Sequence, residues 1–416
     1  MKMLHNWNDF GDPNISAARI LDDTLRDGLQ SPTARTPGLS QKKKLIDLVA
    51  RLGIDGVTLG LPGAGNKARA EIAGLAAYCV STGYTFELVS AVRTHPDDIK
   101  AHLDTCMKSG ATISASLFIG SSPLRQLVEG WSLHELIEKA VTSIRVCVRE
   151  GVPVMFVTED TTRSKPSDIK ALYTAAIDAG AQRVCLADTV GAAEPAGTAA
   201  LVRFMTDIIA ECGAEVGLDW HGHNDRGLAL ANSLAALHAG AGRVHATVLG
   251  LGERAGNTAL DQLIINLKLM GWSRSGDIND LQHLCEKVAE FCAAPLPANY
   301  PAIGPDAFRT ATGVHAAAIT KAMNLEDSSL ADLVYSSVPA SWLGRGQDIE
   351  VGPMSGRSNV EHWLIRHGLD LQHELRERSI AAVLADAKAS QLVLKNEAIW
   401  SSIRKELSKS ASDLVV

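Results

Sequence analysis

Short runs of apolar and β-branched residues recur along the chain, and each is followed by a segment whose apolar positions have helical spacing. Most of these runs are apolar throughout, which is typical of strands that are covered on both faces of a sheet. Eight runs are strand candidates: 18–21, 56–59, 85–89, 112–118, 152–157, 183–186, 215–219 and 243–248.

The segments between the runs carry helix start and stop signals. Ser132 and Glu135 form the S-x-x-E pattern of a capping box, and Gly151 is a natural C-terminal stop. Between them, three- and four-residue spacing predicts an apolar face. Its members are Leu133, Ile137, Val141, Ile144 and Val148. In the segment after the first run, we expect Ser40 to cap a helix that stops at Gly53.

Eight strand–helix repeats over roughly 270 residues predict a (β/α)8 TIM barrel, since such barrels have about 250 residues. A doubly wound open sheet is the alternative, but it more often has a glycine-rich phosphate loop after its first strand. Here that position reads "DDTLRDGLQ". After about residue 275 the alternation stops, and small, mainly helical C-terminal subdomains follow. We expect a catalytic barrel at 1–275, a linker and helical subdomain at 276–335, and a second subdomain at 336–416.

The composition narrows the class of protein. Hydrophobic residues make up 46% of the chain, charged residues 21%, and the formal net charge is −7. These values indicate a globular protein with no nucleic-acid or membrane partner. No apolar run approaches the ~20 residues that span a bilayer, and we see no secretion signal. Seven scattered cysteines without a C-x-x-C pair favour a cytoplasmic protein with reduced thiols.

Polar residues collect where the expected strands end, which is where a TIM barrel carries its active site. They are Arg26 and Asp27 after the first strand, Glu159, Asp160 and Arg163 after the fifth, Asp188 and Thr189 after the sixth, His221 and His223 at the seventh, and Asn257 in the loop after the eighth. Five strands therefore deliver polar groups to one rim.

The stretch "LDWHGHNDRG" contains His221 and His223, which point to the same side if the backbone is extended. In a closed barrel, strands one, seven and eight are neighbours, so Asp27 and Asn257 would meet the two imidazoles. Nitrogen and oxygen ligands together suit one divalent ion, and Mn²⁺, Mg²⁺, Zn²⁺ and Co²⁺ all remain open.

Seven motifs in order resemble the DRE-TIM metallolyase superfamily, and above all its 2-isopropylmalate, homocitrate and related alkylmalate synthases. The motifs of the barrel are "DTLRDGLQ", "TEDTTRSKP", "ADTVG", "HGHNDRGLALANSLAALHAGA" and "GLGERAGNTAL". The resemblance continues after the barrel at "TGVHAAAITKA" and "IEVGPMSGRSNV", so it covers most of the chain.

The resemblance implies roles for matching positions. Asp27, His221 and His223 would bind the metal, and Asn257 would complete or support the site. Arg26 would polarise the carbonyl of a 2-oxo acid.

Four further positions follow from the same resemblance. Thr189 would contact the carboxylate of the 2-oxo acid, and Glu159 would orient or assist a base. The base would be His315 with Glu159, or a water held by these two residues and Tyr335, which lies ten residues before Arg345. We also expect Gln30, Arg163 and Ser116 to contact the substrate.

The implied reaction joins acetyl-CoA to a 2-oxo acid and then hydrolyses the thioester. The metal would act as a Lewis acid on the carbonyl, and Arg26 would stabilise the alkoxide. Because His315 lies outside the barrel, the resemblance implies a homodimer in which the C-terminal subdomain of one subunit covers the barrel of its partner. With 59 residues after Arg357, we expect no leucine-type regulatory domain.

Two departures bear on this interpretation. The synthases usually read D-G-E-Q, whereas this chain has Leu29 in "DGLQ", as 3-hydroxy-3-methylglutaryl-CoA lyases do. Those lyases use a cysteine in the loop after strand eight, and here no cysteine lies between Cys212 and Cys285, which favours a synthase.

Ser116 stands where 2-isopropylmalate synthases often have histidine, so the pocket for the substrate side chain differs. Arg125 either meets an acidic substrate tail or is solvated, and the second is our expectation. The 2-oxo acid stays unassigned.

Overall fold

The computed structural model describes residues 5, 7–8, 13–272, 276, 278–325 and 329–413. The chain forms two compact units, Met1–Pro295 and Leu296–Val416, and each is described by itself. The division lies at Pro295 and not at 275, because helix α11 (Asp280–Cys292) packs against helix α2 (Leu39–Arg51) of the first unit. The second unit therefore contains the expected linker and helical subdomain only from residue 296 onward, together with the whole of the expected second subdomain.

Eight parallel strands of the first unit close into a barrel in chain order, as predicted. They are β1 (Arg19–Asp22), β2 (Gly56–Thr58), β3 (Glu87–Arg93), β4 (Ser114–Gly120), β5 (Val154–Glu159), β6 (Arg183–Asp188), β7 (Gly217–Gly222) and β8 (Arg243–Ala246). Strand β1 pairs with β8 from Arg19↔Arg243 to Asp22↔Ala246, so the sheet has no free edge.

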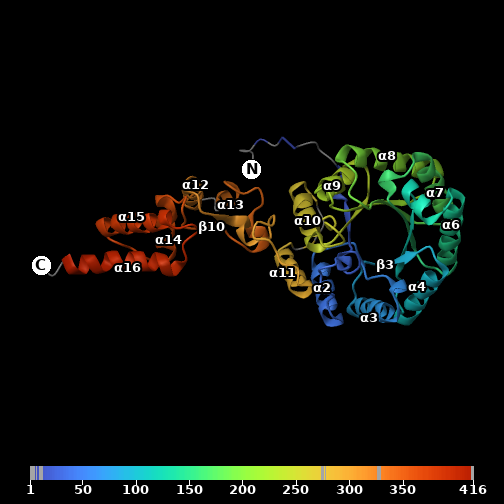
Figure 1. Cartoon of the computed structure of the whole chain (residues 1–416), viewed down its shortest axis with the longest axis horizontal. Coiled ribbons are helices and arrows are strands. Elements are labelled where there is room, and N and C mark those ends of the chain that lie inside the picture. Colours follow the sequence, from blue (N-terminus) through green and yellow to red (C-terminus); the bar gives the residue numbers. More distant parts are fainter. Residues whose placement is uncertain are drawn as a thin grey trace. The chain divides into compact units, whose positions relative to one another are not determined.

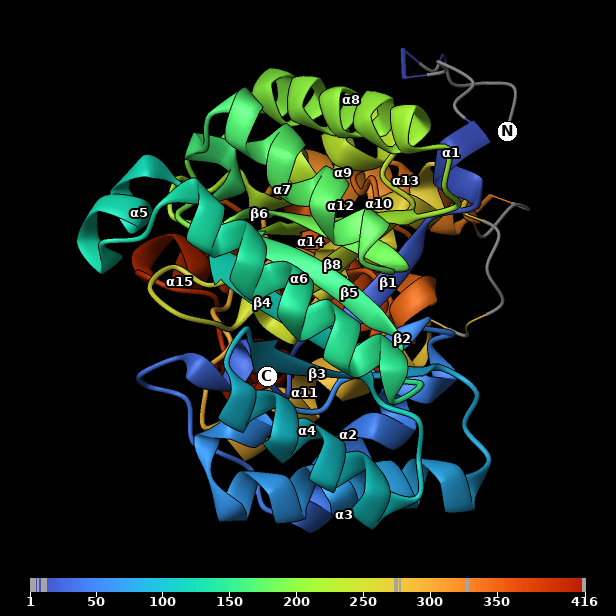
Figure 2. The same ribbon diagram turned by 90° about the vertical axis from the view of Figure 1, so that its right-hand side faces the viewer.

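Helices surround the strands in the view along the barrel (Figure 1). Besides α2 and α11 they are α1 (Pro13–Ser16), α3 (Asn66–Thr82), α4 (Pro96–Ser109), α5 (Pro123–Glu129), α6 (Leu133–Arg149), α7 (Pro166–Asp178), α8 (Pro195–Cys212), α9 (Ala229–Ala239) and α10 (Leu260–Leu269). Figure 2 shows α6 lying over β4 and β5, which it contacts. Among the described residues, no helix is long and apolar enough to cross a membrane.

The predicted capping box of α6 is present. The hydroxyl of Ser132 accepts a hydrogen bond from the Glu135 N–H at 3.3 Å, and the Glu135 carboxylate accepts from the Ser132 N–H at 2.7 Å. The predicted apolar face of this helix is wrong in detail. Its buried residues are Leu136, Ala140, Ser143, Ile144 and Cys147, because the small side chains at 140 and 143 fit closely against the strands. Val148 is 41% exposed.

The expected cap at Ser40 is also wrong, since α2 begins two residues earlier than that cap predicts. Its N-cap is Gly38 in extended backbone, and the side-chain oxygen of Gln41 accepts a hydrogen bond from the Gly38 N–H at 2.9 Å. A glutamine at the third helical position can therefore satisfy the helix start without a capping hydroxyl. Gly53 follows the helix with φ +70°, as a stop residue does.

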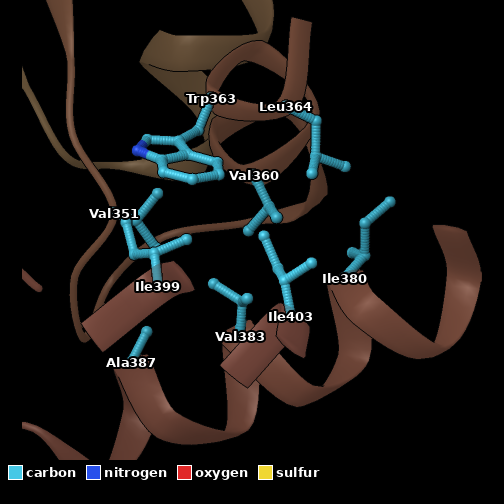
Figure 3. Packing of buried hydrophobic residues seen from close by; sticks show 9 residues of the cluster. All are labelled: Val351, Val360, Trp363, Leu364, Ile380, Val383, Ala387, Ile399 and Ile403. Carbon is cyan, nitrogen blue, oxygen red and sulfur yellow. The ribbon is translucent and has the colours of Figure 1, made fainter. Parts of the chain in front are cut away.

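The second unit is mainly helical and has its own core. A short parallel pair joins β9 (Arg309–Thr310) to β10 (Asp348–Ile349). The helices are α12 (Gly313–Met323), α13 (Ser329–Leu333), α14 (Arg357–Arg366), α15 (His373–Ala389) and α16 (Asn396–Asp413). Figure 3 shows Trp363, Val383 and Ile403 packing together from α14, α15 and α16.

His102 on α4 gives the barrel a predictable acid sensitivity. Its side chain is fully buried, with Nδ1 2.8 Å from the Ser90 hydroxyl on β3, and burial lowers its pKa to about 4. Since an unfolded histidine titrates near 6.5, the neutral folded form adds stability that is complete above about pH 6.5 and is lost as the pH falls towards 4. The free energy of unfolding should drop by about 3 kcal/mol across this window.

Urea unfolding at several pH values tests this expectation. His102→Asn, which keeps a polar atom for Ser90, should flatten the pH dependence between 6.5 and 4, whereas the exposed control His134→Ala should follow the wild-type curve. An unchanged slope in His102→Asn would contradict the assignment.

Candidate active site and metal centre

A cavity of about 240 Å³ opens at the C-terminal ends of the barrel strands. It brings together eight residues that the sequence analysis singled out: Arg26, Asp27, Gln30, Ser116, Glu159, Thr189, His221 and His223. These residues come from β1, β4, β5, β6 and β7 or the turns that follow them, so their convergence is a product of barrel closure.

The turn after β1 holds Arg26 and Asp27 in place. The backbone oxygen of Asp23 accepts hydrogen bonds from the N–H groups of Arg26, Asp27 and Gly28 at 3.2, 2.9 and 3.2 Å. The Asp23 carboxylate accepts from the Arg26 guanidinium through both Nε, at 3.1 Å, and Nη2. Asp23 thus holds both the backbone and the guanidinium group of Arg26. The Arg26 side chain is 22% exposed and lines the cavity.

Asp27, His221 and His223 form a compact set of three buried ligand atoms. Oδ2 of Asp27 lies 3.1 Å from Nε2 of His221 and 3.6 Å from Nε2 of His223, and the two Nε2 atoms are 3.3 Å apart. Ligands bound at about 2.1 Å to one ion lie about 3.0 to 3.4 Å apart in octahedral or tetrahedral geometry. Two of the three separations lie in this range and the third, 3.6 Å, is slightly longer, so the three residues fit one divalent ion with only a small adjustment.

Asn257 lies beside this set of ligands, because its backbone forms an isolated antiparallel β-bridge with that of His223. Its Nδ2 donates to Oδ2 of Asp27 at 2.6 Å, and its buried Oδ1 has no hydrogen-bond partner among the described residues. An unpaired buried oxygen beside a ligand cluster is consistent with a supporting or ligating role, since burial of an unsatisfied acceptor is otherwise costly.

The protonation states suit metal binding. Burial would raise the pKa of Asp27, but Arg26, His221 and His223 outweigh it and hold that pKa well below its usual value. Burial, together with His221, lowers the pKa of His223 to about 4. At neutral pH the aspartate is charged and His223 is neutral, as metal ligands must be.

A second group, Asp23, His221 and His245, also has three close ligand atoms. Its members are already engaged, because Asp23 is bound by Arg26 and Nε2 of His245 lies 3.0 Å from Asp219 on β7. The first group is therefore the better candidate for an ion.

Two of the candidates for substrate contact, Thr189 and Glu159, line the cavity, whereas Arg163 does not. The hydroxyl of Thr189 accepts a hydrogen bond from the Asp160 N–H at 2.8 Å, which leaves its hydrogen free to donate. Burial raises the pKa of Glu159, while Arg125, 3.5 Å away, and Arg26 oppose that shift. Arg163 differs from these residues: it pairs with Asp160 through two bonds of 2.7 Å and does not line the cavity.

Several lining residues were missed by the sequence analysis: Ala91, Phe118, Val157, Ala187, His245 and Glu253. Phe118 and Val157 lie two residues from Ser116 and Glu159 on the same strands, so the two-residue alternation of a strand contained the signal. His245 is buried in β8, where its ring lies 5.4 Å from that of His221.

His315 and Tyr335 both belong to the second unit. The side chains, twenty positions apart in the chain, stack with ring centroids 4.0 Å apart and planes 29° apart. His315 lies on α12, and Tyr335 is 47% exposed. The structure thus brings these two candidate residues into contact, although their spacing in the sequence did not predict it.

The chain is similar to curated enzymes along most of its length. Homocitrate synthase AksA of Methanothermobacter thermautotrophicus is 32% identical over 356 residues, which cover 85% of each protein. The 2-isopropylmalate synthase of Sulfolobus acidocaldarius is 30% identical over 399 residues, covering 93% of this chain and 98% of that enzyme.

Solved structures share the fold. The hydroxymethylglutaryl-CoA lyase of Pseudomonas aeruginosa has a TM-score of 0.54 at 21% identity, covering 66% of this chain and 93% of that one. The carboxyl transferase domain of Rhizobium etli pyruvate carboxylase has a TM-score of 0.52 at 15% identity, covering 96% and 62%.

The HMGL-like family matches residues 17–288, a stretch that holds the barrel and every residue of the ligand cluster. The resemblance seen in the motifs is thereby confirmed. This chain belongs to the HMGL-like family, and its relatives at about 30% identity are alkylmalate synthases.

Proposed function

We propose that this chain condenses acetyl-CoA with a 2-oxo acid and hydrolyses the thioester, giving a 2-alkylmalate-type product and free CoA. The observation that carries this proposal is the buried set of Asp27, His221 and His223 beside Arg26, inside a cavity at the strand ends. The names of the homocitrate and 2-isopropylmalate synthases at about 30% identity support the same reaction class.

Each residue has a chemical task in this reaction. Asp27, His221 and His223 would hold the divalent ion, with Asn257 beside them, and the ion supplies Lewis-acid polarisation of the keto group. The Thr189 hydroxyl donates to the substrate carboxylate. Arg26 faces the keto oxygen and stabilises the negative charge that this oxygen gains.

The proton and electron balance is simple. A base takes a proton from the methyl group of acetyl-CoA, and the resulting enolate carbon bonds to C2 of the 2-oxo acid while the C=O electron pair moves to oxygen. That oxygen then gains a proton, and water cleaves the C–S bond to release the CoA thiol. Histidine suits the base, so we assign this task to His315, with Tyr335 stacked on it and Glu159 orienting the base or its water.

Release of free thiol tests the proposal directly. With Mn²⁺ and acetyl-CoA present, at least one member of a panel of 2-oxo acids should liberate CoA, and removal of the metal by a chelator should stop it. A lyase would instead cleave 3-hydroxy-3-methylglutaryl-CoA and release no CoA with any 2-oxo acid. The loop at 247–259 contains no cysteine to support that alternative.

The proposal also includes a homodimer in which His315 of one subunit serves the barrel of the other. Asp27→Ala and His315→Ala should each be inactive alone. When the two are unfolded together and refolded as a mixture, up to about a quarter of wild-type activity should return, because half of the dimers are mixed and each of these contains one intact site. No recovery in mixtures that do form dimers would contradict this arrangement.

A further inference from the structure

The wall of the cavity opposite the metal ligands has a distinct composition. Strands β3, β4 and β5 lie across the closed barrel from β7, β8 and β1, which carry or flank the ligand cluster. Ala91, Ser116, Phe118 and Val157 line the cavity from those three strands. Ala91 pairs with Ser116 and Phe118 pairs with Val157 across neighbouring strands, so the four side chains form one continuous surface, which we call the far wall.

The far wall is apolar apart from one hydroxyl, and it offers no cation. Arg26 is the only lysine or arginine that lines the cavity within the described barrel, and the carboxylates of Asp23 and Asp27 already hold it. A carboxylate that reached the far wall would therefore be buried without a positive partner, which is strongly unfavourable.

Two arginines follow the far-wall strands, and both form ion pairs with nearby carboxylates. Arg93, at the end of β3, binds the buried carboxylate of Asp98 through bonds of 2.7 and 2.8 Å. The Nη atoms of Arg125 on α5 lie 3.1 Å from Glu129 and 3.5 Å from Glu159, while its buried Nε has no hydrogen-bond partner among the described residues. Neither side chain lines the cavity.

The far wall also leaves room. Ala91 and Ser116 are small, so a substrate with only a methyl side chain would leave Phe118 and Val157 uncovered. Each additional methylene group buried against such a surface strengthens binding about fourfold.

We propose that the 2-oxo acid of this enzyme carries an apolar side chain larger than methyl and no second carboxylate. The inference rests on the proposed function, because that function orients the keto acid with its oxygens at the metal ligands, Arg26 and Thr189. The side chain then points across the cavity to the far wall.

Binding measurements test the inference without depending on turnover. The full-length protein loaded with Mn²⁺ is titrated calorimetrically with pyruvate, 3-methyl-2-oxobutanoate, 4-methyl-2-oxopentanoate, phenylpyruvate and 2-oxoglutarate, in the absence of acyl-CoA. The tightest apolar acid should bind at least tenfold more tightly than pyruvate and at least a hundredfold more tightly than 2-oxoglutarate. Equal or tighter binding of pyruvate or 2-oxoglutarate, or binding of none of the acids, would overturn it.

A variant of the far wall sharpens the test. Ala91→Leu fills the space beside Ser116, so the dissociation constant for the best apolar acid should rise at least tenfold relative to that for pyruvate. The control Ala200→Leu makes the same change at an exposed position of α8 and should leave that ratio unchanged. An unchanged ratio in a folded Ala91→Leu protein refutes the far wall as the site of the substrate side chain. If that variant does not fold, the calorimetric titrations of the wild-type protein test the proposal by themselves.

The two proposals fail in different ways. Absence of CoA release with every 2-oxo acid removes the condensation, even if the apolar acids bind. Release of CoA with 2-oxoglutarate as the best substrate keeps the condensation and removes the apolar side chain.

Discussion

Replacing His221 with alanine should remove the bound metal and abolish turnover. The imidazole supplies the central atom of the cluster, since its Nε2 lies 3.1 Å from Oδ2 of Asp27 and 3.3 Å from Nε2 of His223. Loss of a residue that only supports a ligand lowers metal affinity 10- to 100-fold, so loss of a ligand should lower it by at least about a hundredfold. Turnover should fall by at least about a thousandfold, because polarisation of the keto group is lost.

Metal content after dialysis, measured by mass spectrometry, and CoA release are the two readouts. His134→Ala makes the same substitution at an exposed position of α6 and should match the wild type in both. A His221→Ala protein that keeps a full equivalent of metal, or full activity, would refute the ligand assignment. A thermal melt separates loss of metal from loss of fold.

Arg26→Lys should leave the metal bound and slow the reaction. Lysine keeps the positive charge but cannot bind Asp23 through two nitrogens and face the cavity at the same time. Removing one preorganised donor to a developing oxyanion typically costs about 2.7 to 4 kcal/mol, so kcat should fall about 100- to 1000-fold. The KM for the 2-oxo acid should change much less, because the interaction strengthens mainly in the transition state.

The matched control is Arg51→Lys at the exposed C-terminal end of α2, which should keep wild-type kinetics. The measurements are the steady-state rate of CoA release and the Mn²⁺ content of the Arg26→Lys protein. A kcat within threefold of wild type would show that Arg26 serves only to hold the turn at Asp23, and would remove it from the chemistry.

Much of the barrel could be predicted because its strands are buried on both faces. Apolar and β-branched runs, most of them continuous, marked all eight strands, and Ser132 with Glu135 marked the start of α6, since both signals depend on neighbours in the chain. The face of α6 could not be predicted in the same way. The three- and four-residue spacing of apolar residues predicted a buried face that includes Val148. The strands beneath α6 instead pack against small side chains, so Ala140, Ser143 and Cys147 are buried there.

The ligand cluster was predictable for a similar reason, while the far wall was not recognised. Two-residue alternation aligned His221 with His223, and chain order in a closed barrel brought Asp27 near them. The same alternation passes through Val157 and Phe118, but apolar residues in a strand give no local sign of facing a cavity. Arg163 shows the opposite case, since a charged residue after β5 pairs with its neighbour Asp160 and stays out of the cavity.

The sequence by itself determined the order of strands and helices, the class of fold and the residues able to bind a metal, because these depend on periodicity and on the chemical nature of side chains. Only the tertiary structure decided how closely the ligand atoms approach, that His315 stacks on Tyr335 and that an apolar wall faces the metal ligands. Those distances are set by barrel closure and side-chain packing between segments up to 230 residues apart, as for Asn257 and Asp27, and no local pattern encodes them.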